Sequence, residues 1–190
     1  MTRTIVHQAR SERGVSLIDM MVMLSVMAIV GSMATMQMVT VRRALVGDGA
    51  MRLVMAQLNT AREMAITQRR NMEIQFVGNN WLQIVRNEVP SGTTVVTNVA
   101  LEGNARFSLV AGVPDTPDGF GNSSAISFGA APTIRFGPTG ALIDNNGAPI
   151  NGTVFLSVAN LPESFRAVTV LGAVGRVLGY RWNGAAWKRV

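Results

Sequence analysis

Apolar residues fill an early part of the chain almost without interruption. Between Arg13 and Arg42 lie 28 residues that carry a single charge, Asp19. A helix that crosses a bilayer needs about 20 predominantly apolar residues, so this stretch is long enough to span a membrane. An aspartate at the centre of such a helix costs about 2.5 to 3.5 kcal/mol, which nearly cancels the contribution of its Val, Leu and Ile neighbours. Asp19 is therefore a candidate functional residue.

Helical periodicity continues beyond the apolar stretch. Apolar side chains recur every three or four positions at Met51, Val54, Met55, Leu58, Ala61 and Ala65. This spacing predicts an amphipathic continuation, so that one helix runs from Val15 to about Arg70. Gly31 and Gly47-Asp48-Gly49 are its weak points, where a kink could form, because interior glycine costs about 1 kcal/mol relative to alanine.

The period of the pattern changes at Met72. Apolar and polar residues alternate over 72–76, a turn follows at 78–80 and another strand-like run covers 81–85, which together predict a β-hairpin. Turn-forming residues separate further short strands, which we expect at 93–99, 107–110, 133–136, 154–158, 167–171 and 177–182.

These patterns predict an α+β fold with one long N-terminal helix. Residues 15–41 form its transmembrane half and residues 42–71 its outer, amphipathic half. A small antiparallel β-sheet domain, residues 72–190, packs against the outer half, because the apolar faces of the helix and the sheet then cover each other.

The N-terminus has features of a cleaved secretory signal. Three arginines precede the apolar core, and Ser32-Met33-Ala34 is a small-x-small cleavage site. Asp19 inside the core, and the continuation of the apolar stretch beyond Ala34, argue against cleavage there. A signal-anchored periplasmic binding protein that keeps its N-terminus is an open alternative.

A different cleavage site precedes the apolar stretch. Arg13-Gly14-Val15-Ser16-Leu17-Ile18-Asp19 resembles the leader junction of type IV prepilins and pseudopilins. The resemblance implies that prepilin peptidase removes residues 1–14 by cutting between Gly14 and Val15, and that Val15 is then N-methylated. It also implies that Asp19 pairs with the amino terminus of a neighbouring subunit during assembly. The family usually has Glu at this place, and the shorter Asp makes the strength of that contact less certain.

The same resemblance gives the chain an orientation. Three arginines lie on each side of the apolar stretch, so the positive-inside rule does not decide it. The prepilin-like junction implies a cytoplasmic leader, a single pass through the bacterial inner membrane and a C-terminal domain in the periplasm, which joins a pilus or pseudopilus after assembly.

Later segments resemble the GspH/FimT group of minor pilins and type II secretion minor pseudopilins. They are residues 58–66, with the pair Ala61-Arg62, then residues 134–140, ending in Gly137-Pro138-Thr139-Gly140, and finally residues 168–170 with Gly175-Arg176. The resemblance implies a structural subunit at the tip of a filament or in the initiation of its assembly. Its partners would be other pilin or pseudopilin subunits.

The amino-acid composition excludes most kinds of catalytic site. The chain has no Cys, so it has no disulfide, thiolate metal site or cysteine nucleophile. His7, the one histidine, lies in the leader, so the processed chain has no imidazole for a catalytic triad or a metal. Asp115 with Asp118, or Asp144 with its Asn neighbours, could bind a cation, but such clusters are typical of turns. We expect no enzyme activity, no metal and no cofactor.

The positive charge of the chain, +6 overall, is uneven. From Ser164 onward there is no acidic residue, and aromatic residues alternate with Arg166, Arg176, Arg181, Lys188 and Arg189. Basic side chains neutralise phosphates and aromatic rings stack on bases, so this tail is a candidate DNA-binding surface. Its proposed contacts are Arg176, Arg181, Lys188 and Arg189, which would suit a DNA-binding minor pilin in natural transformation. In the other interpretation, Trp182 and Trp187 are packing residues.

Overall fold

The computed structural model describes residues 16–129 and 134–190. The chain divides into two compact units, residues 1–39 and residues 40–190. The predicted leader and Val15 lie outside the described residues, as does Thr133 at the start of one predicted strand.

One helix, α1 (Leu17–Gln68), supplies all of the regular structure described in the first unit. There the large apolar side chains that the structure describes, between Leu17 and Val39, are 48% to 75% exposed. The most apolar part of α1 carries few charged residues, and none of it is buried. The helix is therefore long and apolar enough to cross a bilayer.

The outer segment of α1, residues 40–68, belongs to the second unit. It passes through Gly47-Asp48-Gly49 without interruption, so the helix is not broken at the predicted weak point. A Cβ at Gly47 would come within 2.7 Å of the Ser164 carbonyl oxygen, and the glycine therefore allows a close approach. The helix ends in a Schellman cap, in which Arg69 has a φ of 50° and the Arg70 amide donates to the Ala65 carbonyl.

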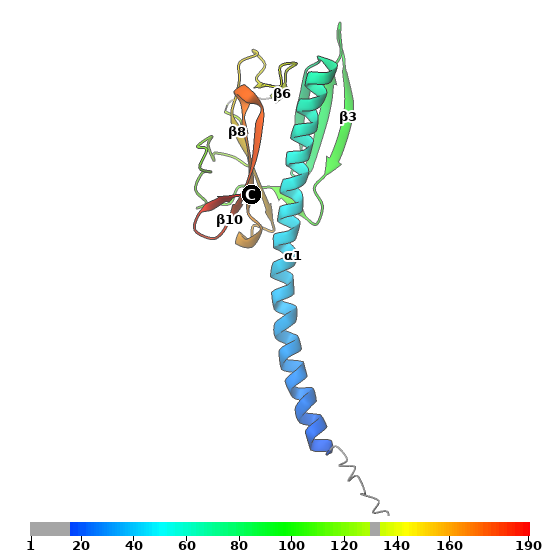
Figure 1. Cartoon of the computed structure of the whole chain (residues 1–190), viewed down its shortest axis with the longest axis vertical. Coiled ribbons are helices and arrows are strands. Elements are labelled where there is room, and N and C mark those ends of the chain that lie inside the picture. The colour runs from blue at the N-terminus through cyan, green and yellow to red at the C-terminus, as the bar shows by residue number, and fades with distance from the viewer. Residues whose placement is uncertain (1–15, 130–133) are drawn as a thin grey trace, which may run out of the picture. The chain divides into compact units, whose positions relative to one another are not determined.

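Two antiparallel sheets complete the second unit (Figure 1). The first sheet has the order β3-β2-β1-β6-β7, with β1 (Met72–Val77), β2 (Trp81–Asn87), β3 (Thr93–Ala100), β6 (Ile134–Phe136) and β7 (Leu142–Ile143). The second has the order β11-β10-β9-β8-β4, with β4 (Ala105–Phe107), β8 (Gly152–Val158), β9 (Arg166–Leu171), β10 (Arg176–Trp182) and β11 (Trp187–Arg189). The two-residue strand β5 (Ile126–Ser127) also pairs with β8, and two short 3-10 helices, η1 (Pro162–Ser164) and η2 (Gly172–Val174), flank β9.

The structure confirms the α+β fold and refines its β part. Most predicted strands are present with ends shifted by one to three residues, but the strand expected at 107–110 ends at Phe107. Strands β5, β7 and β11 were not predicted, because two or three residues are too short to show an alternating pattern. The predicted antiparallel β-sheet domain consists of two sheets.

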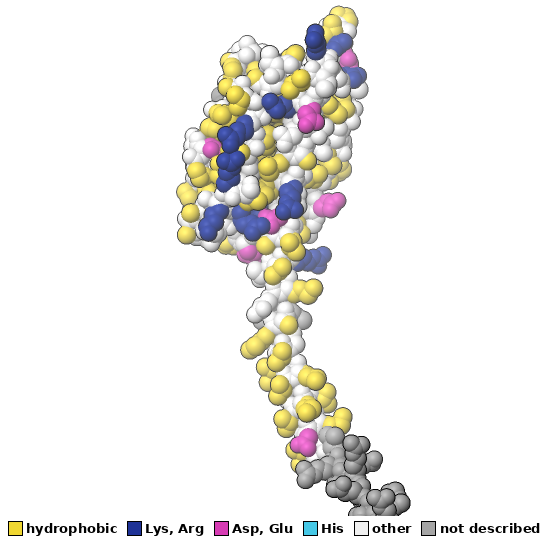
Figure 2. Space-filling view, viewed as in Figure 1, with side chains coloured by type: hydrophobic (Ala, Val, Ile, Leu, Met, Phe, Trp, Pro, Cys, Tyr) yellow, Lys and Arg dark blue, Asp and Glu magenta, His cyan; other side chains and the backbone are white. Residues whose placement is uncertain are grey.

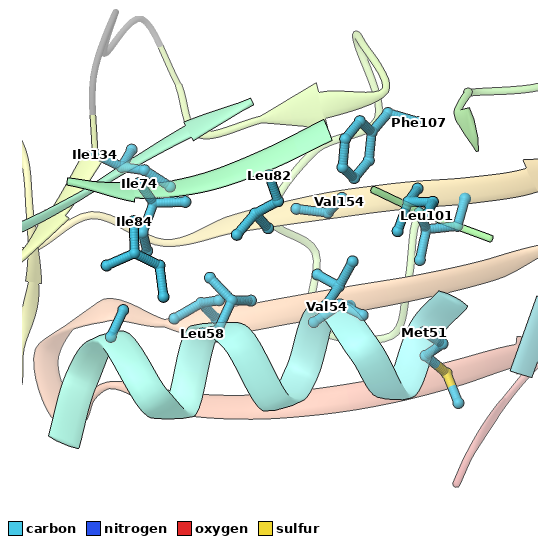
Figure 3. Packing of buried hydrophobic residues seen from close by; sticks show 14 of the residues in the cluster. Met51, Val54, Leu58, Ile74, Leu82, Ile84, Leu101, Phe107, Ile134 and Val154 are labelled. Atoms are coloured by element: carbon cyan, nitrogen blue, oxygen red, sulfur yellow. The ribbon is translucent and has the colours of Figure 1, made fainter. Parts of the chain in front are cut away.

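The main core lies between the outer segment of α1 and the sheets. Val54 and Leu58 point from the helix toward Leu82 and Ile84 of the first sheet (Figure 3). Strand β8 is buried along its whole length, because both faces of the second sheet are covered. On the face away from α1, a second cluster contains Phe155, Phe165, Ala167, Tyr180 and Trp187.

Candidate functional site

Asp19, the residue singled out in the apolar stretch, lies in the first turn of α1 with an exposed side chain. The first backbone N–H groups of a helix have no partner within it, so a carboxylate is favourable at this place. Gly14 and Val15 lie outside the described residues, and the cleavage and methylation there remain predictions.

A buried carboxylate in the outer segment of α1 forms the centre of a second charged site. Asp48 is only 9% exposed and lies beside two arginines from the second sheet. The Arg166 Nε donates to its Oδ1 at 2.5 Å. The Arg181 Nε donates to the same oxygen at 3.3 Å, while the Arg181 Nη2 pairs with Oδ2. Asp48 therefore joins the helix to β9 and β10.

Arg166 is the largest fully buried side chain among the described residues, with 1% of its area exposed. Its Nη1 donates to the carbonyl oxygens of Glu163 and Phe165, and its Nη2 to that of Ala44 at 3.0 Å. All three guanidinium nitrogens are therefore hydrogen-bonded, which a buried charge requires. Arg166 is a structural residue, and it is not available to an external ligand.

The Asp48 carboxylate compensates a row of like charges. In the strand register Arg166 lies opposite Arg181, and Arg181 lies opposite Lys188, so three cations share the face of the sheet toward α1. Like charges directly opposite each other are destabilising. Burial by itself raises the pKa of a carboxyl, but the Arg166 hydrogen bond and charge, with those of Arg181, hold the pKa of Asp48 below its usual value.

Sequence reasoning did not identify this site. It treated Asp48 as part of a weak point in the helix and Arg166 as part of a basic tail. One signal was available, because Asp48 lies three residues before Met51 and hence on the apolar stripe of the helix. A charge on a buried face needs a buried partner, although the sequence does not say which one.

The four candidate DNA contacts lie on two different faces of the second sheet. Arg181 and Lys188 are opposite each other on the face toward α1, and Arg181 is held by Asp48. Arg176 and Arg189 lie on the other face, because alternate strand residues point to opposite sides. All four are exposed, and Figure 2 shows Lys and Arg side chains spread over the visible face of the second unit.

The tail aromatics pack against each other and against the second core cluster. Trp187 is buried, its ring lies 5.3 Å from that of Trp182, and its Nε1 donates to the Pro114 carbonyl at 2.8 Å. Tyr180 is also buried and donates to Asp118. The packing interpretation is therefore correct for Trp187, and Trp182 is half-buried against it. The buried Trp187 and Tyr180 present no free ring for stacking on a base.

Two of the aspartates considered as cation ligands, Asp115 and Asp144, serve as turn acceptors, whereas Asp118 accepts hydrogen bonds from the hydroxyl groups of Thr169 and Tyr180. Asp115 accepts hydrogen bonds from the amides of Thr116 and Gly121, and Asp144 accepts them from Asn146 and Ala148. In residues 16–129 and 134–190, no three His, Asp or Glu side chains gather as metal ligands would.

Three segments singled out in the sequence meet at one junction. They are the part of α1 that contains Arg62 and the two turns that contain Gly140 and Gly175. The Arg62 Nε donates to the Gly140 carbonyl at 3.2 Å. A Cβ at Gly175 would overlap that same carbonyl oxygen and lie 2.7 Å from the Arg62 Nε. Both glycines also have positive φ, 80° and 62°. Arg62, Gly140 and Gly175 therefore pack together at one junction.

Residues 50–174 match the family described as type II transport protein GspH. The match covers the outer segment of α1 from Ala50 onward and most of both sheets. No curated protein and no solved structure matches the chain in the same comparisons.

We predict that Asp48→Ala destabilises the protein by about 3 to 5 kcal/mol, because it leaves the buried Arg166 without its carboxylate. Denaturant unfolding at pH 7 measures the effect. The matched control is Glu163→Gln, which removes the half-exposed 3.5 Å pair with Arg43 and should cost less than about 1 kcal/mol. Equal losses from the two variants would contradict the assigned role of Asp48.

The ion pairs of Asp48 should make the unfolding free energy depend on pH. The pKa of Asp48 is lower in the folded protein than the ordinary carboxyl value of about 3.9. The ionised carboxylate therefore makes its full contribution to the unfolding free energy above this ordinary value. It is lost as the pH falls through the lowered pKa. The unfolding free energy of the wild type should therefore fall more steeply below about pH 4 than that of Asp48→Asn.

Gly175→Ala should destabilise the protein more than Gly184→Ala, by about 1 to 3 kcal/mol. Both glycines have positive φ, so both substitutions introduce backbone strain. A Cβ at Gly184 meets no atom within 4 Å, whereas one at Gly175 overlaps the junction with Gly140. Thermal unfolding of the two variants measures the difference, and equal melting temperatures would contradict the junction.

Proposed function

Because the chain belongs to the GspH family of type II transport proteins, we propose that it is a minor pseudopilin or minor pilin anchored in the bacterial inner membrane by the first part of α1. The family consists of structural subunits that associate with other pseudopilins. We place this subunit at the tip of a filament or in the initiation of its assembly, with its sheets in the periplasm.

The observation that carries the proposal is the apolar surface of α1 before Val39. Its large apolar side chains, where the structure describes them, are all exposed, and Figure 2 shows hydrophobic side chains along the visible face of the helix. Contiguous apolar area of this kind is unfavourable in water, because each buried CH₂ contributes about 0.8 kcal/mol. Lipid covers such a helix before assembly, and the helices of neighbouring subunits cover it afterwards.

Asp19 gives this helix its proposed role in assembly. A carboxylate that enters an apolar helix bundle needs a cation, since opposite charges attract strongly where the effective dielectric constant is low. Cleavage between Gly14 and Val15 creates a new amino terminus, and that of a neighbouring subunit can supply this cation. The carboxylate and the amine would together fix the position of the incoming subunit.

Two alternatives lead to different expectations. A DNA-binding minor pilin is supported by the exposure of Arg176, Lys188 and Arg189, none of which makes an ion pair with a described residue. Arg176 and Arg189 share a face and would form the contact there. A salt-dependent shift of linear DNA that neutralising these two residues abolishes would favour this alternative. A signal-anchored binding protein would keep Met1.

Mass spectrometry of the protein from membranes of its host should find a mature N-terminus at N-methylated Val15. Gly14 replaced by a bulky residue, as in Gly14→Leu, should leave residues 1–14 attached, because the peptidase site is then lost. Ser16→Ala is the control and should be processed. An unprocessed native chain, or one that begins at Thr35, would contradict the proposal.

Asp19→Ala should insert into the membrane normally but be lost from filaments, because the partner amine then has no carboxylate. Asp19→Glu keeps the charge and should assemble at least as well as the wild type. The measurement compares each variant in the membrane fraction and in sheared or purified filaments. Wild-type incorporation by Asp19→Ala would count against a role for this carboxylate.

A further inference from the structure

The two sheets have four edge strands, which differ in length and charge. Three of the edge strands are short: β7 has two residues, and β4 and β11 have three residues each. Two of these carry basic residues, Arg106 in β4 and Lys188 with Arg189 in β11. Short strands and charges are the usual means by which proteins prevent an edge from pairing with another chain.

The fourth edge, β3, is neither short nor charged, and its one irregularity is a β-bulge in which Val96 has no partner on β2. It runs for eight residues, Thr93–Ala100, with no charge and no proline, and its first five residues are all Thr or Val. It pairs with β2 on one side only. Its side chains are mostly exposed, with Val95 at 56% and Val96 at 37%. An antiparallel edge strand of this length leaves a row of backbone N–H and C=O groups without a strand partner.

The position of β3 limits which chain could pair with it. Figure 1 shows β3 alongside the outer segment of α1. Two copies paired symmetrically through antiparallel β3 strands would have their outer segments pointing in opposite directions. Subunits that follow one another in a filament are related by a head-to-tail repeat, so their outer segments share one direction. The other edges of this chain are too short to pair with β3 in a head-to-tail contact.

We propose that β3 is a docking edge for an extended, uncharged segment of a different pilin-like subunit, which adds a strand to the first sheet. Backbone hydrogen bonds would provide the affinity, and Val95 and Val96 would contact β-branched or other apolar side chains of the added strand. This inference rests on the proposed function for the class of its partner. It assigns to the β part of the molecule an assembly contact separate from Asp19.

The test uses Val95→Lys in the full-length, tagged chain, produced in its host so that its native partners are present. A lysine on the edge should oppose strand addition without disturbing the fold, because the side chain is exposed. The matched control is Val174→Lys, at a position with 54% exposure in η2 and away from β3. We expect Val95→Lys to reduce the co-purified partner about tenfold relative to the control, with an unchanged melting temperature.

A photo-reactive amino acid at position 95, with position 174 as control, then identifies what lies against the edge. A cross-link from position 95 to an extended segment of a different pilin-like subunit supports the proposal. Cross-linking only to a second copy of this chain overturns it, and so does equal co-purification by the two lysine variants. If the wild-type chain co-purifies with no pilin-like subunit, the proposed function itself fails.

Discussion

The buried charge pairing of Asp48 with Arg166 is the interaction on which the arrangement of the second unit depends. It joins residues 118 positions apart and connects α1 to the second sheet. A buried ion pair is not by itself strong evidence of net stabilisation, because desolvation of both charges opposes it. Here each arginine nitrogen has an acceptor, and the carboxylate also offsets Arg181 across the strand pair. The pair therefore specifies how the helix meets the sheet.

Glycine allows the close contacts around this pair. Gly47, the neighbour of Asp48, lets the helix approach the Ser164 carbonyl closely because it has no side chain. At the far end of the outer segment, Gly140 and Gly175 likewise leave room for Arg62. The helix is thus fixed to the sheets at two places by an arginine and at least one glycine. Between them lies the apolar stripe that includes Met51, Val54 and Leu58.

The two parts of α1 meet different physical demands. Residues before Val39 expose apolar side chains, and Asp19 is the one charge among the described residues there. Residues from 40 onward bury one stripe against the sheets, and the charge on that stripe, Asp48, has its partners within the chain. None of the described residues forms an ion pair with Asp19. The proposed assembly depends on this difference, because one aspartate is satisfied by folding and the other requires a second subunit.

The sequence by itself determined the long helix, the hairpin of β1 and β2, and most later strands, since periods of 3.6 and 2 are local properties of the chain. It also indicated the membrane-length apolar stretch and the family resemblance. It could not identify the partners of Asp48, the separation of Arg176 from Arg181 onto opposite faces, or the meeting of Arg62 with Gly140 and Gly175. It also could not show that β3 is an edge strand with a partner on one side only. These features depend on which strands become neighbours, and that order follows from packing of the whole chain rather than from any local pattern.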